Sequence, residues 1–395
     1  MAASDILWAR DETERIIVIK ELTVGVHVPS RTSGGGSVFY ENLISEIASS
    51  NSLGRLVIYG SGVSTRFGDM SDRARIVEVA SSNNQILDRL LHPWRLKRAF
   101  IEAPCDALVF AGTAISRVGA TKHIFWPLTV APLEEYAVSL IAKTASQRAR
   151  WRLLEFSISR AARKADAAIY SSNYAAELYE ARYNSLGRVP STVIWPAVSL
   201  TEEQAKPTMR SGPQQITVLF VSHAYRYKRL VELIEAFADA FRATGVHMVL
   251  QIAGSIPDKR YEQEVKNAIT SSGCDDRIVL MGNVGKAALS TLYENADIFA
   301  FPSASENAGS YALIDAFRYG VAVISSDSSS MPEICGPAAL YVDVESRSDF
   351  AEKLSLLAAD RELRLHYAQL SSERFHEFPS WKQIGEELQT FLQDI

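Results

Sequence analysis

The sequence predicts an α/β protein made of two doubly wound domains that face each other across a cleft. Three observations lead to this prediction. Apolar runs of strand length alternate with amphipathic runs of helix length, which is the pattern of parallel sheets covered by helices. The alternation stops once, at a polar segment, and then restarts. The chain has 395 residues, 47% of them apolar, which is enough for two sizeable hydrophobic cores.

The N-terminal domain is expected to span residues 1–200. Its predicted strands are short apolar runs at 16–24, 55–60, 105–112, 123–130, 165–172 and 188–198. Its predicted helices show apolar residues at helical spacing and lie at 38–48, 134–164 and 173–183. A polar, glycine-rich loop, SRTSGGGS at 30–37, joins the first strand to the first helix.

Residues 201–214 contain two prolines and one glycine and show no apolar periodicity, so we expect an interdomain linker there. The C-terminal domain is expected to span 215–379. Its predicted strands lie at 216–222, 247–254, 277–282, 296–303 and 321–326, and its predicted helices lie at 229–244, 261–273, 286–296 and 310–320. A final helix, 380–395, follows Pro379 and is expected to leave this domain.

Composition excludes several classes of protein. Lys and Arg number 41 and Asp and Glu number 46, a net charge of −5 without a dominant basic tail, so nucleic acid is not an expected partner. Cys105, Cys274 and Cys335 form no CxxC pair, which predicts free thiols in a reducing compartment. The N-terminus lacks the apolar core of a signal peptide and no window approaches 18 apolar residues, so we expect a cytoplasmic protein.

Candidate binding residues are sought in loops after strands, because ligands of open α/β sheets bind beyond the carboxyl ends of the strands. In the loop at 31–37, Gly35 and Gly36 would let the backbone approach a phosphate or sugar diphosphate, and a flexible connection is the alternative. After the strand at 216–222, the run HAYRYKR places four potentially cationic side chains at a helix start, where the helix dipole disfavours cations. A bound diphosphate would resolve that conflict.

A third loop, SASENAGSYALID at 303–315, follows the strand at 296–303 and opens a helix. Its backbone N–H groups would be available to a phosphate. Glu306 would accept hydrogen bonds from sugar hydroxyls, although it could instead cap the helix. Asp315, about two turns further on, would accept from a ribose and needs a partner in an otherwise apolar helix.

The second half resembles the family 4 retaining glycosyltransferases, which have the GT-B fold of two Rossmann-like domains. FVSHAYRYKRLVELIEAF is similar to the family's glycine-arginine, short gap, lysine stretch. FAFPSASENAGSYALIDAFRYGVAVISSD is similar to its proline-serine, acid, glycine, acid-alanine block, and MPEICGPAALYVDVES to its Pro-Glu and following strand. The similarity covers 216–395 well and the first half loosely, through the glycine loop, CDALVFAG and ADAAIYSSN.

The resemblance implies a nucleotide-diphosphate-sugar donor on the C-terminal domain, an acceptor on the N-terminal domain, and a terminal helix that crosses back to the first domain. It implies that Lys228 contacts the diphosphate and Glu306 the donor sugar, and these two are the expected catalytic residues. The expected donor-binding set is Gly35, Gly36, His223, Arg226, Arg229, Gly282, Asn283, Asn307, Ala308, Gly309, Ser310, Tyr311 and Asp315. The family is usually metal-independent, which agrees with the lack of an Asp-x-Asp pair, and no cofactor is expected.

The sequence departs from the family pattern in three places. His223 stands where the family has an arginine, so this phosphate contact would be weaker or depend on protonation, and Arg226 or Arg229 would replace it. Eight residues rather than seven separate Glu306 from Asp315, and the second acid is one methylene shorter. The family's histidine from the N-terminal domain has no match in WPLTVAPLEE.

The expected function is therefore transfer of a sugar to an acceptor hydroxyl with retention, in glycan or polysaccharide assembly. Two alternatives stay open. A nucleotide-sugar epimerase of the same fold would need acid and base side chains deep in the cleft, and would act without an acceptor. A catalytically silent sugar-binding subunit would bind nucleotide without turnover.

Residues 143–164 form a basic segment with seven basic residues and one acid, and Trp151, Leu154, Ile158 and Ala161 share one helical face. One interpretation is a helix packed on the sheet. The other is peripheral contact with anionic lipid beside a lipid-linked acceptor. A second basic and aromatic patch favours the latter and comprises Arg89, His92, Trp94, Arg95, Lys97 and Arg98.

Overall fold

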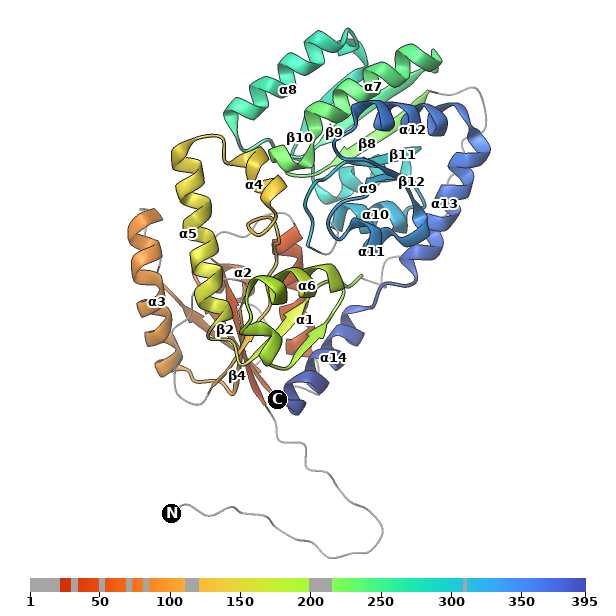
Figure 1. The fold of residues 1–395 in the computed structure, drawn as a ribbon. Helices are drawn as coiled ribbons and strands as arrows, with labels where there is room; N and C mark the ends of the chain where they lie inside the picture. Colours follow the sequence, from red (N-terminus) through yellow and green to blue (C-terminus); the bar gives the residue numbers. More distant parts are fainter. Residues whose placement is uncertain are drawn as a thin grey trace, which may run out of the picture.

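A computed structural model describes the chain at 22–29, 35–49, 54–68, 73–80, 85–110, 121–198, 215–307 and 311–395, apart from the side chains of 85–90, 92 and 93. The described residues form two α/β domains, one above the other in Figure 1. The last helix runs from the upper, C-terminal domain down to the lower, N-terminal one. The linker-like segment 201–214 lies outside the described residues.

The N-terminal domain is built on a seven-stranded parallel sheet with the order β3-β2-β1-β4-β5-β6-β7. Its strands are β1 (Thr23–Val28), β2 (Arg55–Gly60), β3 (Ala74–Glu78), β4 (Ala107–Phe110), β5 (Lys122–Phe125), β6 (Ala167–Tyr170) and β7 (Ser191–Val193). The predicted strand at 16–24 is wrong in its bounds, because β1 starts at Thr23 and continues to Val28. Residues 16–21 lie outside the described ranges. β3, at the sheet edge, is five residues long and only partly buried, and no strand was predicted there.

Helices cover both faces of this sheet. They are α1 (Gly35–Ser49), α2 (Val63–Phe67), α3 (Gln85–Glu102), α4 (Glu135–Ile141), α5 (Ala145–Ala162) and α6 (Asn173–Arg182). α1 and α2 pack on one face, and α3, α5 and α6 on the other. The single helix predicted at 134–164 is two helices, because Thr144 caps α5 through a capping box with Gln147.

The C-terminal domain has a six-stranded parallel sheet with the order β10-β9-β8-β11-β12-β13. Its strands are β8 (Ile216–Val221), β9 (Met248–Ala253), β10 (Ile278–Gly282), β11 (Ile298–Phe301), β12 (Ala322–Ser326) and β13 (Ala339–Val342). Its helices are α7 (Leu230–Thr244), α8 (Lys259–Ser272), α9 (Lys286–Glu294), α10 (Tyr311–Arg318), α11 (Met331–Cys335), α12 (Arg347–Ala359) and α13 (Arg361–Phe375). α7, α8 and α12 cover one face and α9, α10, α11 and α13 the other.

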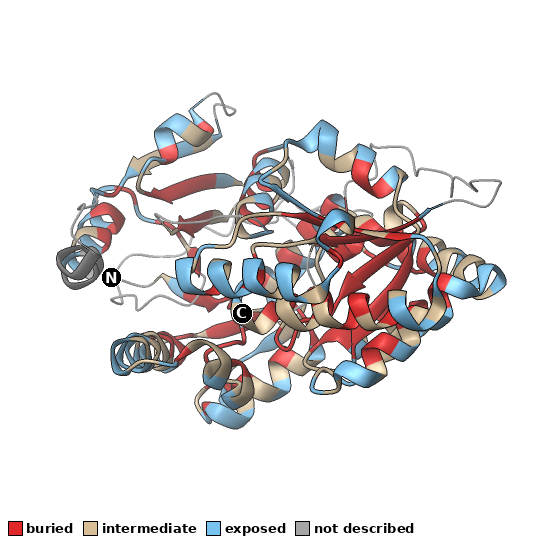
Figure 2. Cartoon of the chain, turned by 90° about the horizontal axis from the view of Figure 1, so that it is seen from above, coloured by how far each residue is buried: buried red, intermediate tan, exposed pale blue. Residues whose placement is uncertain are grey.

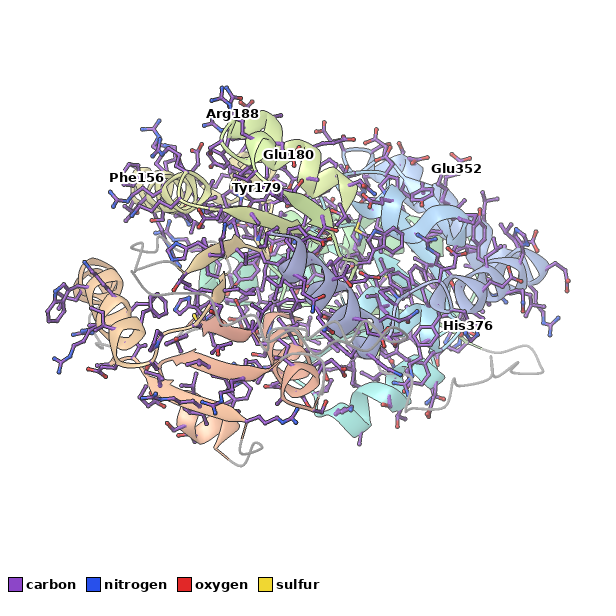
Figure 3. The ribbon with its side chains drawn as sticks, turned by 90° about the horizontal axis from the view of Figure 1, so that it is seen from below. Phe156, Tyr179, Glu180, Arg188, Glu352 and His376 are labelled. Carbon is purple, nitrogen blue, oxygen red and sulfur yellow. The ribbon has the colours of Figure 1, made fainter. Side chains whose placement is uncertain are left out.

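Burial follows this layering. Figure 2 shows the strands as buried layers between helices whose outer sides are exposed. Tyr179 of α6 is fully buried, with its ring centroid 5.5 Å from that of Phe125 in β5, and Figure 3 places it beside the sheet. The same view places Phe156 of α5 at the outer margin of the molecule. Within the described residues, no helix is both long and apolar enough to cross a membrane.

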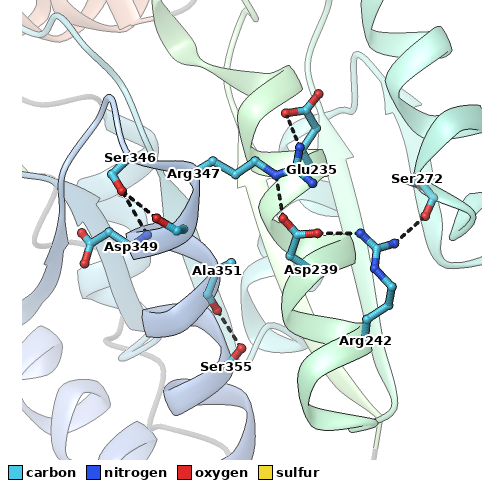
Figure 4. Close-up of polar contacts among 10 residues, drawn as sticks. Glu235, Asp239, Arg242, Ser272, Ser346, Arg347, Asp349, Ala351 and Ser355 are labelled. Carbon is cyan, nitrogen blue, oxygen red and sulfur yellow. Dashed lines mark hydrogen bonds and ion pairs between the residues drawn. The ribbon is translucent and has the colours of Figure 1, made fainter.

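A polar network joins α7 to α12 on the outside of the C-terminal domain (Figure 4). The Arg347 Nε donates to Asp239 at 2.6 Å, and its Nη1 lies 3.1 Å from Glu235. The hydrogen bond from Arg347 lowers the pKa of Asp239. Because these side chains are partly exposed, the pairs add under about 1 kcal/mol each and mainly fix how the two helices lie.

The last helix, α14 (Trp381–Asp394), joins the core of the N-terminal domain. Trp381, Ile384, Leu388 and Leu392 are buried there, against α1. Val198 and Ser380 form an isolated parallel bridge, so both chain crossings between the domains lie side by side. This arrangement ties the two domains together next to the loops that follow the strands.

Candidate active site

A cavity of about 510 Å³ lies between the two domains, at the carboxyl ends of strands from both sheets. The C-terminal domain contributes the loops after β8, β9, β10 and β11 and the start of α10. The N-terminal domain contributes the loops after β5, β6 and β7, the start of α1, and α14. This is where ligands of parallel α/β sheets bind.

Most of the predicted site residues that the structure describes line this cavity. They are Gly35, Gly36, His223, Lys228, Asn283, Glu306, Asn307, Tyr311 and Asp315. Arg226, Arg229 and Gly282 do not line it. Ala308, Gly309 and Ser310 lie outside the described residues, as do Arg31 to Gly34 of the glycine loop.

The centre of the C-terminal half is an ion pair between Lys228 and Glu306. Their side chains are only 9% and 10% exposed. The Lys228 Nζ also lies 5.0 Å from the ring centroid of Phe301. Burying two charges is costly unless they pair, and removing one partner of such a pair costs about 3–5 kcal/mol. The site therefore holds a cation and a carboxylate side by side at its centre, although removing both charges from water costs free energy.

The backbone of Glu306 is fixed by serines from the loop after β12. The Glu306 N–H donates to the Ser329 Oγ at 3.0 Å, and the Glu306 carbonyl accepts from the hydroxyls of Ser329 at 2.7 Å and Ser330 at 2.9 Å. Hydrogen bonds to both its backbone groups hold this residue in one place. Its carboxylate is therefore preorganised beside Lys228 rather than free to swing into solvent.

The structure does not support Arg226 and Arg229 as replacements for the missing family arginine. Arg226 points to α8, where its guanidinium pairs with Glu264 and lies 4.8 Å from the ring centroid of Tyr261. Glu264 raises the pKa of Arg226 through this pair. Arg229 pairs with Glu232 at 3.0 Å. Both cations are thus engaged by acids outside the cavity.

His223 does line the cavity, directly after β8. Its Nδ1 lies 2.6 Å from the Ser255 Oγ, so the ring has a fixed orientation. The neighbouring Gly254 has φ 123°, and a Cβ there would lie 1.9 Å from the Ser222 carbonyl oxygen. Only glycine fits at this point, where the loops after β8 and β9 meet.

Tyr311 and Asp315 lie on α10, one turn apart, and both face the cavity. A Cβ placed on Gly35 would lie 3.3 Å from the Tyr311 ring, so the start of α1 in the first domain lies against α10 of the second. Burial raises the pKa of Tyr311. Burial, followed by the charge of Asp315, raises the pKa of Tyr293.

The loop that carries Glu306 is also held by the N-terminal domain. The Asn307 Nδ2 donates to the Pro127 carbonyl at 2.9 Å, and the Ser172 hydroxyl donates to the Asn307 carbonyl. The Ser305 hydroxyl donates to the Glu134 Oε2. Residues on either side of Glu306 therefore contact the first domain, so the position of Glu306 depends on domain closure.

A further interdomain contact lies at the start of α6. Both carboxylate oxygens of Glu333, in α11, accept backbone N–H groups of that helix, from Asn173 at 2.8 Å and from Tyr174 at 2.9 Å. An acid at a helix N-terminus is favourable because it satisfies donors that the helix leaves open. This acid belongs to the Pro-Glu segment noted in the sequence.

Sequence analysis missed Glu134, which follows the apolar run LTVAPL and immediately precedes α4. It accepts from the Tyr174 hydroxyl at 2.7 Å and from Ser305. Burial, opposed by these hydrogen bonds and assisted by the charge of Glu306, raises the pKa of Glu134 above the usual 4.5. The adjacent acids Glu134 and Glu135, after an apolar run, are the signal in the sequence for this position.

The N-terminal half of the cavity has a different lining. Its aromatic and aliphatic side chains are Val38, Phe39, Trp126, Leu128, Val130, Ile194, Trp195, Trp381 and Ile384. Its polar side chains are Thr129 and Ser171, and Ser171 accepts from the Trp126 Nε1 at 3.1 Å. Among the described residues that line this half, none is charged. Of the residues predicted from the sequence, only Gly35 and Gly36 lie in this half.

Comparison with known proteins shows which family model and which solved structures this chain is similar to. Residues 202–374 match the family model described as glycosyl transferases group 1. No curated protein sequence matches the chain. Among solved structures, sucrose-phosphate synthase from Thermosynechococcus elongatus superposes with a TM-score of 0.78 at 14% identity, over 95% of this chain and 99% of that chain.

Two further structures superpose over nearly their whole length. WaaG, a glycosyltransferase involved in lipopolysaccharide biosynthesis, gives a TM-score of 0.72 at 15% identity, over 93% of this chain and 99% of that one. Anabaena Alr3699/HepE in complex with UDP-glucose gives 0.71 at 12% identity, over 95% and 100%. The two sheets, the cleft and these superpositions establish the GT-B fold, and residues 202–374 are similar to the group 1 glycosyltransferase family model.

Proposed function

We propose that the protein transfers a sugar from a nucleotide-diphosphate-sugar donor to a hydroxyl of a glycan or lipid-linked acceptor, with retention at the anomeric carbon and without a metal ion. The observation that carries this proposal is the buried Lys228–Glu306 pair at the carboxyl edge of the C-terminal sheet, inside the interdomain cavity. The match of residues 202–374 to the group 1 model supports it, and the solved complex of HepE with UDP-glucose is a protein of this fold with such a donor.

The C-terminal half of the cavity would hold the donor. Lys228, His223 and the N-terminal end of α10 would face the diphosphate, because a cation, an imidazole and open backbone N–H groups all favour phosphate. Glu306 would accept hydrogen bonds from the sugar hydroxyls. Asp315 would accept from the ribose, with Asn283 beside it in the same half of the lining.

The main catalytic contribution would be electrostatic. As the bond between the sugar and the diphosphate breaks, negative charge grows on the leaving oxygen, and Lys228 is held where it would stabilise that charge. The acceptor hydroxyl would attack from the leaving-group face, and the diphosphate oxygen would take its proton. Glu306, the one carboxylate next to Lys228 among the described lining residues, is already paired, which favours this route over a covalent glycosyl intermediate.

A stability screen tests the donor assignment. Thermal unfolding would be measured with UDP, GDP, ADP and their common sugars, because a ligand at 100 times its Kd stabilises the fold by about 2.7 kcal/mol. We expect one nucleotide series to raise the midpoint. The best donor would then be incubated with and without acceptors, and the anomeric configuration of the product read by NMR.

The outcomes separate the alternatives. A product that needs an acceptor and keeps the donor configuration supports the proposal. Conversion of the donor without an acceptor would indicate an epimerase, and binding without turnover for any acceptor would indicate a silent subunit. A Glu306→Ala variant that transferred sugar at the wild-type rate would remove the role given to that acid.

A further inference from the structure

We propose that the outer side of α3 and α5 is a docking surface for an anionic lipid bilayer, which goes beyond the proposed transfer reaction. These two helices cover the same face of the N-terminal sheet, and their inner sides share one hydrophobic core. Figures 1 and 3 both show them on the same flank of the molecule. Their outer sides carry large apolar residues mixed with cations.

On α3, the exposed side is a stripe rather than a scatter of residues. Leu91, Trp94 and Ile101 are 36%, 65% and 65% exposed, and they lie at helical spacing with Arg98 between them. Lys97 is exposed beside this stripe, and Arg98 also pairs with Glu102 at 3.0 Å. The opposite side of the helix fills the core. This helix is therefore apolar on two sides, and only one of them has a protein partner in the described chain.

On α5, the exposed side is not the apolar face identified in the sequence. The predicted apolar face packs inward, and Ile158 and Ala161 are buried in the core. The exposed side carries Leu153, 48% exposed, and Phe156, 55% exposed, and Figure 3 shows Phe156 at the outer margin. The exposed cations Arg152, Arg160 and Arg163 flank them.

The composition of this surface favours an anionic bilayer over a neutral protein as its partner. Five of the eleven exposed large apolar side chains in the described residues lie on these two helices. A surface whose large apolar side chains are interleaved with Lys and Arg matches an interface with anionic headgroups, because the rings and aliphatic chains enter the acyl boundary while the cations stay at headgroup level. A neutral protein partner would gain nothing from the cations.

The surface lies beside the cleft. Three residues separate α4 from α5, and α4 contacts the 3-10 turn at Arg226–Lys228, which carries the cation of the proposed donor site. A bilayer on α3 and α5 would thus hold the cavity close to the headgroup region, where a lipid-linked acceptor presents its hydroxyl. This last step rests on the proposed function, whereas the docking itself does not.

Sedimentation of the full chain with vesicles tests the docking. Vesicles of phosphatidylcholine alone and of phosphatidylcholine with phosphatidylglycerol would be compared at low and high salt. We expect pelleting with the anionic vesicles at low salt and little with the neutral ones. A double variant, Arg152→Glu with Arg160→Glu, should weaken partitioning at least about 25-fold, since each cation near an anionic surface contributes about fivefold.

Matched variants keep the test specific. Trp94→Ser with Phe156→Ser removes the apolar anchors and should also abolish pelleting. Lys259→Glu with Lys382→Glu makes the same charge change at residues 87% and 82% exposed elsewhere and should pellet like the wild type. Leu356→Ser with Val279→Ser removes exposed apolar side chains elsewhere and should do the same.

Each result decides the proposal. Failure of the wild type to pellet with anionic vesicles, or equal loss in the matched variants, would overturn it. Dimerisation that the Trp94 and Phe156 variant abolishes, in the absence of vesicle binding, would reassign this surface to contacts between copies of the chain. Transfer to a water-soluble acceptor should be unchanged in all variants, so failure of the reaction and failure of docking are distinguishable.

Discussion

The two halves of the cleft are built from the same kind of loop, but charged side chains line one half and apolar side chains line the other. Each half consists of loops at the carboxyl ends of a parallel sheet. The C-terminal half brings in His223, Lys228, Glu306 and Asp315, and the N-terminal half brings in aromatic and aliphatic side chains without a charged residue in its described lining. The two domains therefore share an architecture but line their halves of the cleft with different side chains.

This difference indicates a division between the two substrates. A nucleotide diphosphate needs cations and hydrogen-bond partners, which the C-terminal half supplies. Apolar side chains that line this half, such as Val38 and Leu128, suit the ring faces of a sugar or the apolar part of an acceptor. The predictions below test this division in order of decreasing effect.

The largest effect is expected for Lys228→Met. Loss of a preorganised charge at the leaving group should lower kcat by about 10²–10³-fold. It should also lower the free energy of unfolding by about 3 kcal/mol, because Glu306 stays buried without its partner. Steady-state kinetics and urea unfolding would measure the two losses.

Two controls separate these losses. The double variant Lys228→Met with Glu306→Gln should recover much of the stability but none of the activity. Arg226→Met breaks a half-exposed pair outside the cavity and should cost under about 1 kcal/mol. Full activity in Lys228→Met would show that the buried pair is structural only.

A charge placed in the apolar half should act on the acceptor. Leu128→Glu puts a carboxylate into a lining without a described countercharge, so the KM for the acceptor should rise by about tenfold, from desolvation of an unpaired charge. Donor affinity should stay the same. Leu128→Met keeps the volume and should behave like the wild type, and Leu356→Glu, at an exposed site on α12, should have no effect on either substrate.

Two neighbouring glycines provide a finer test of domain closure. Gly35→Ala places a Cβ 3.3 Å from the Tyr311 ring across the domain boundary, which should cost about 1 kcal/mol and lower kcat several-fold. Gly36→Ala meets nothing within 4 Å and should change activity little. Equal activities in the two variants would mean that closure does not bring Gly35 and Tyr311 together.

The smallest effect concerns pH and Glu134. Burial raises the folded-state pKa of Glu134 above the unfolded value near 4.5. Its contribution to stability is therefore fully present below pH 4.5 and is lost as the pH rises through the raised pKa. Glu134→Gln cannot titrate, so the stability of the wild type relative to this variant should fall across that window. Urea unfolding at a series of pH values measures it, and a constant difference would contradict it.

The fold could be read from the sequence because its strands are buried on both faces. β2 coincides with the predicted run at 55–60, and β8 to β12 fall within their predicted runs, whereas β13 has no counterpart among them. The helix α3 and the edge strand β3 were not predicted. α3 carries apolar residues on its exposed side as well as its buried side, which obscures the helical period, and β3 is short and only partly buried. The break at Thr144 depends on a local capping box that apolar periodicity does not reveal.

The site could be read only in part. Lys228 and Glu306 lie in the loops after β8 and β11, and Asp315 lies in the first turns of α10, the helix after β11, so the order of strands and helices brings them to one edge. The direction of a side chain is set by tertiary contacts, and Glu264 turns Arg226 away in a manner that no local pattern shows. Glu134 acquires its role from Ser305, which is 171 positions away in the sequence.

Equilibrium binding of each substrate to Lys228→Met and Leu128→Glu tests the division of the cleft most directly. Calorimetry would use the donor identified by the stability screen and an acceptor that turns over. We expect Lys228→Met to weaken donor binding by about tenfold or more, through loss of a charged contact to phosphate, with acceptor binding unchanged. Leu128→Glu should show the reverse. Weakening of donor binding by Leu128→Glu as large as that by Lys228→Met would contradict the assignment of the two halves to two substrates.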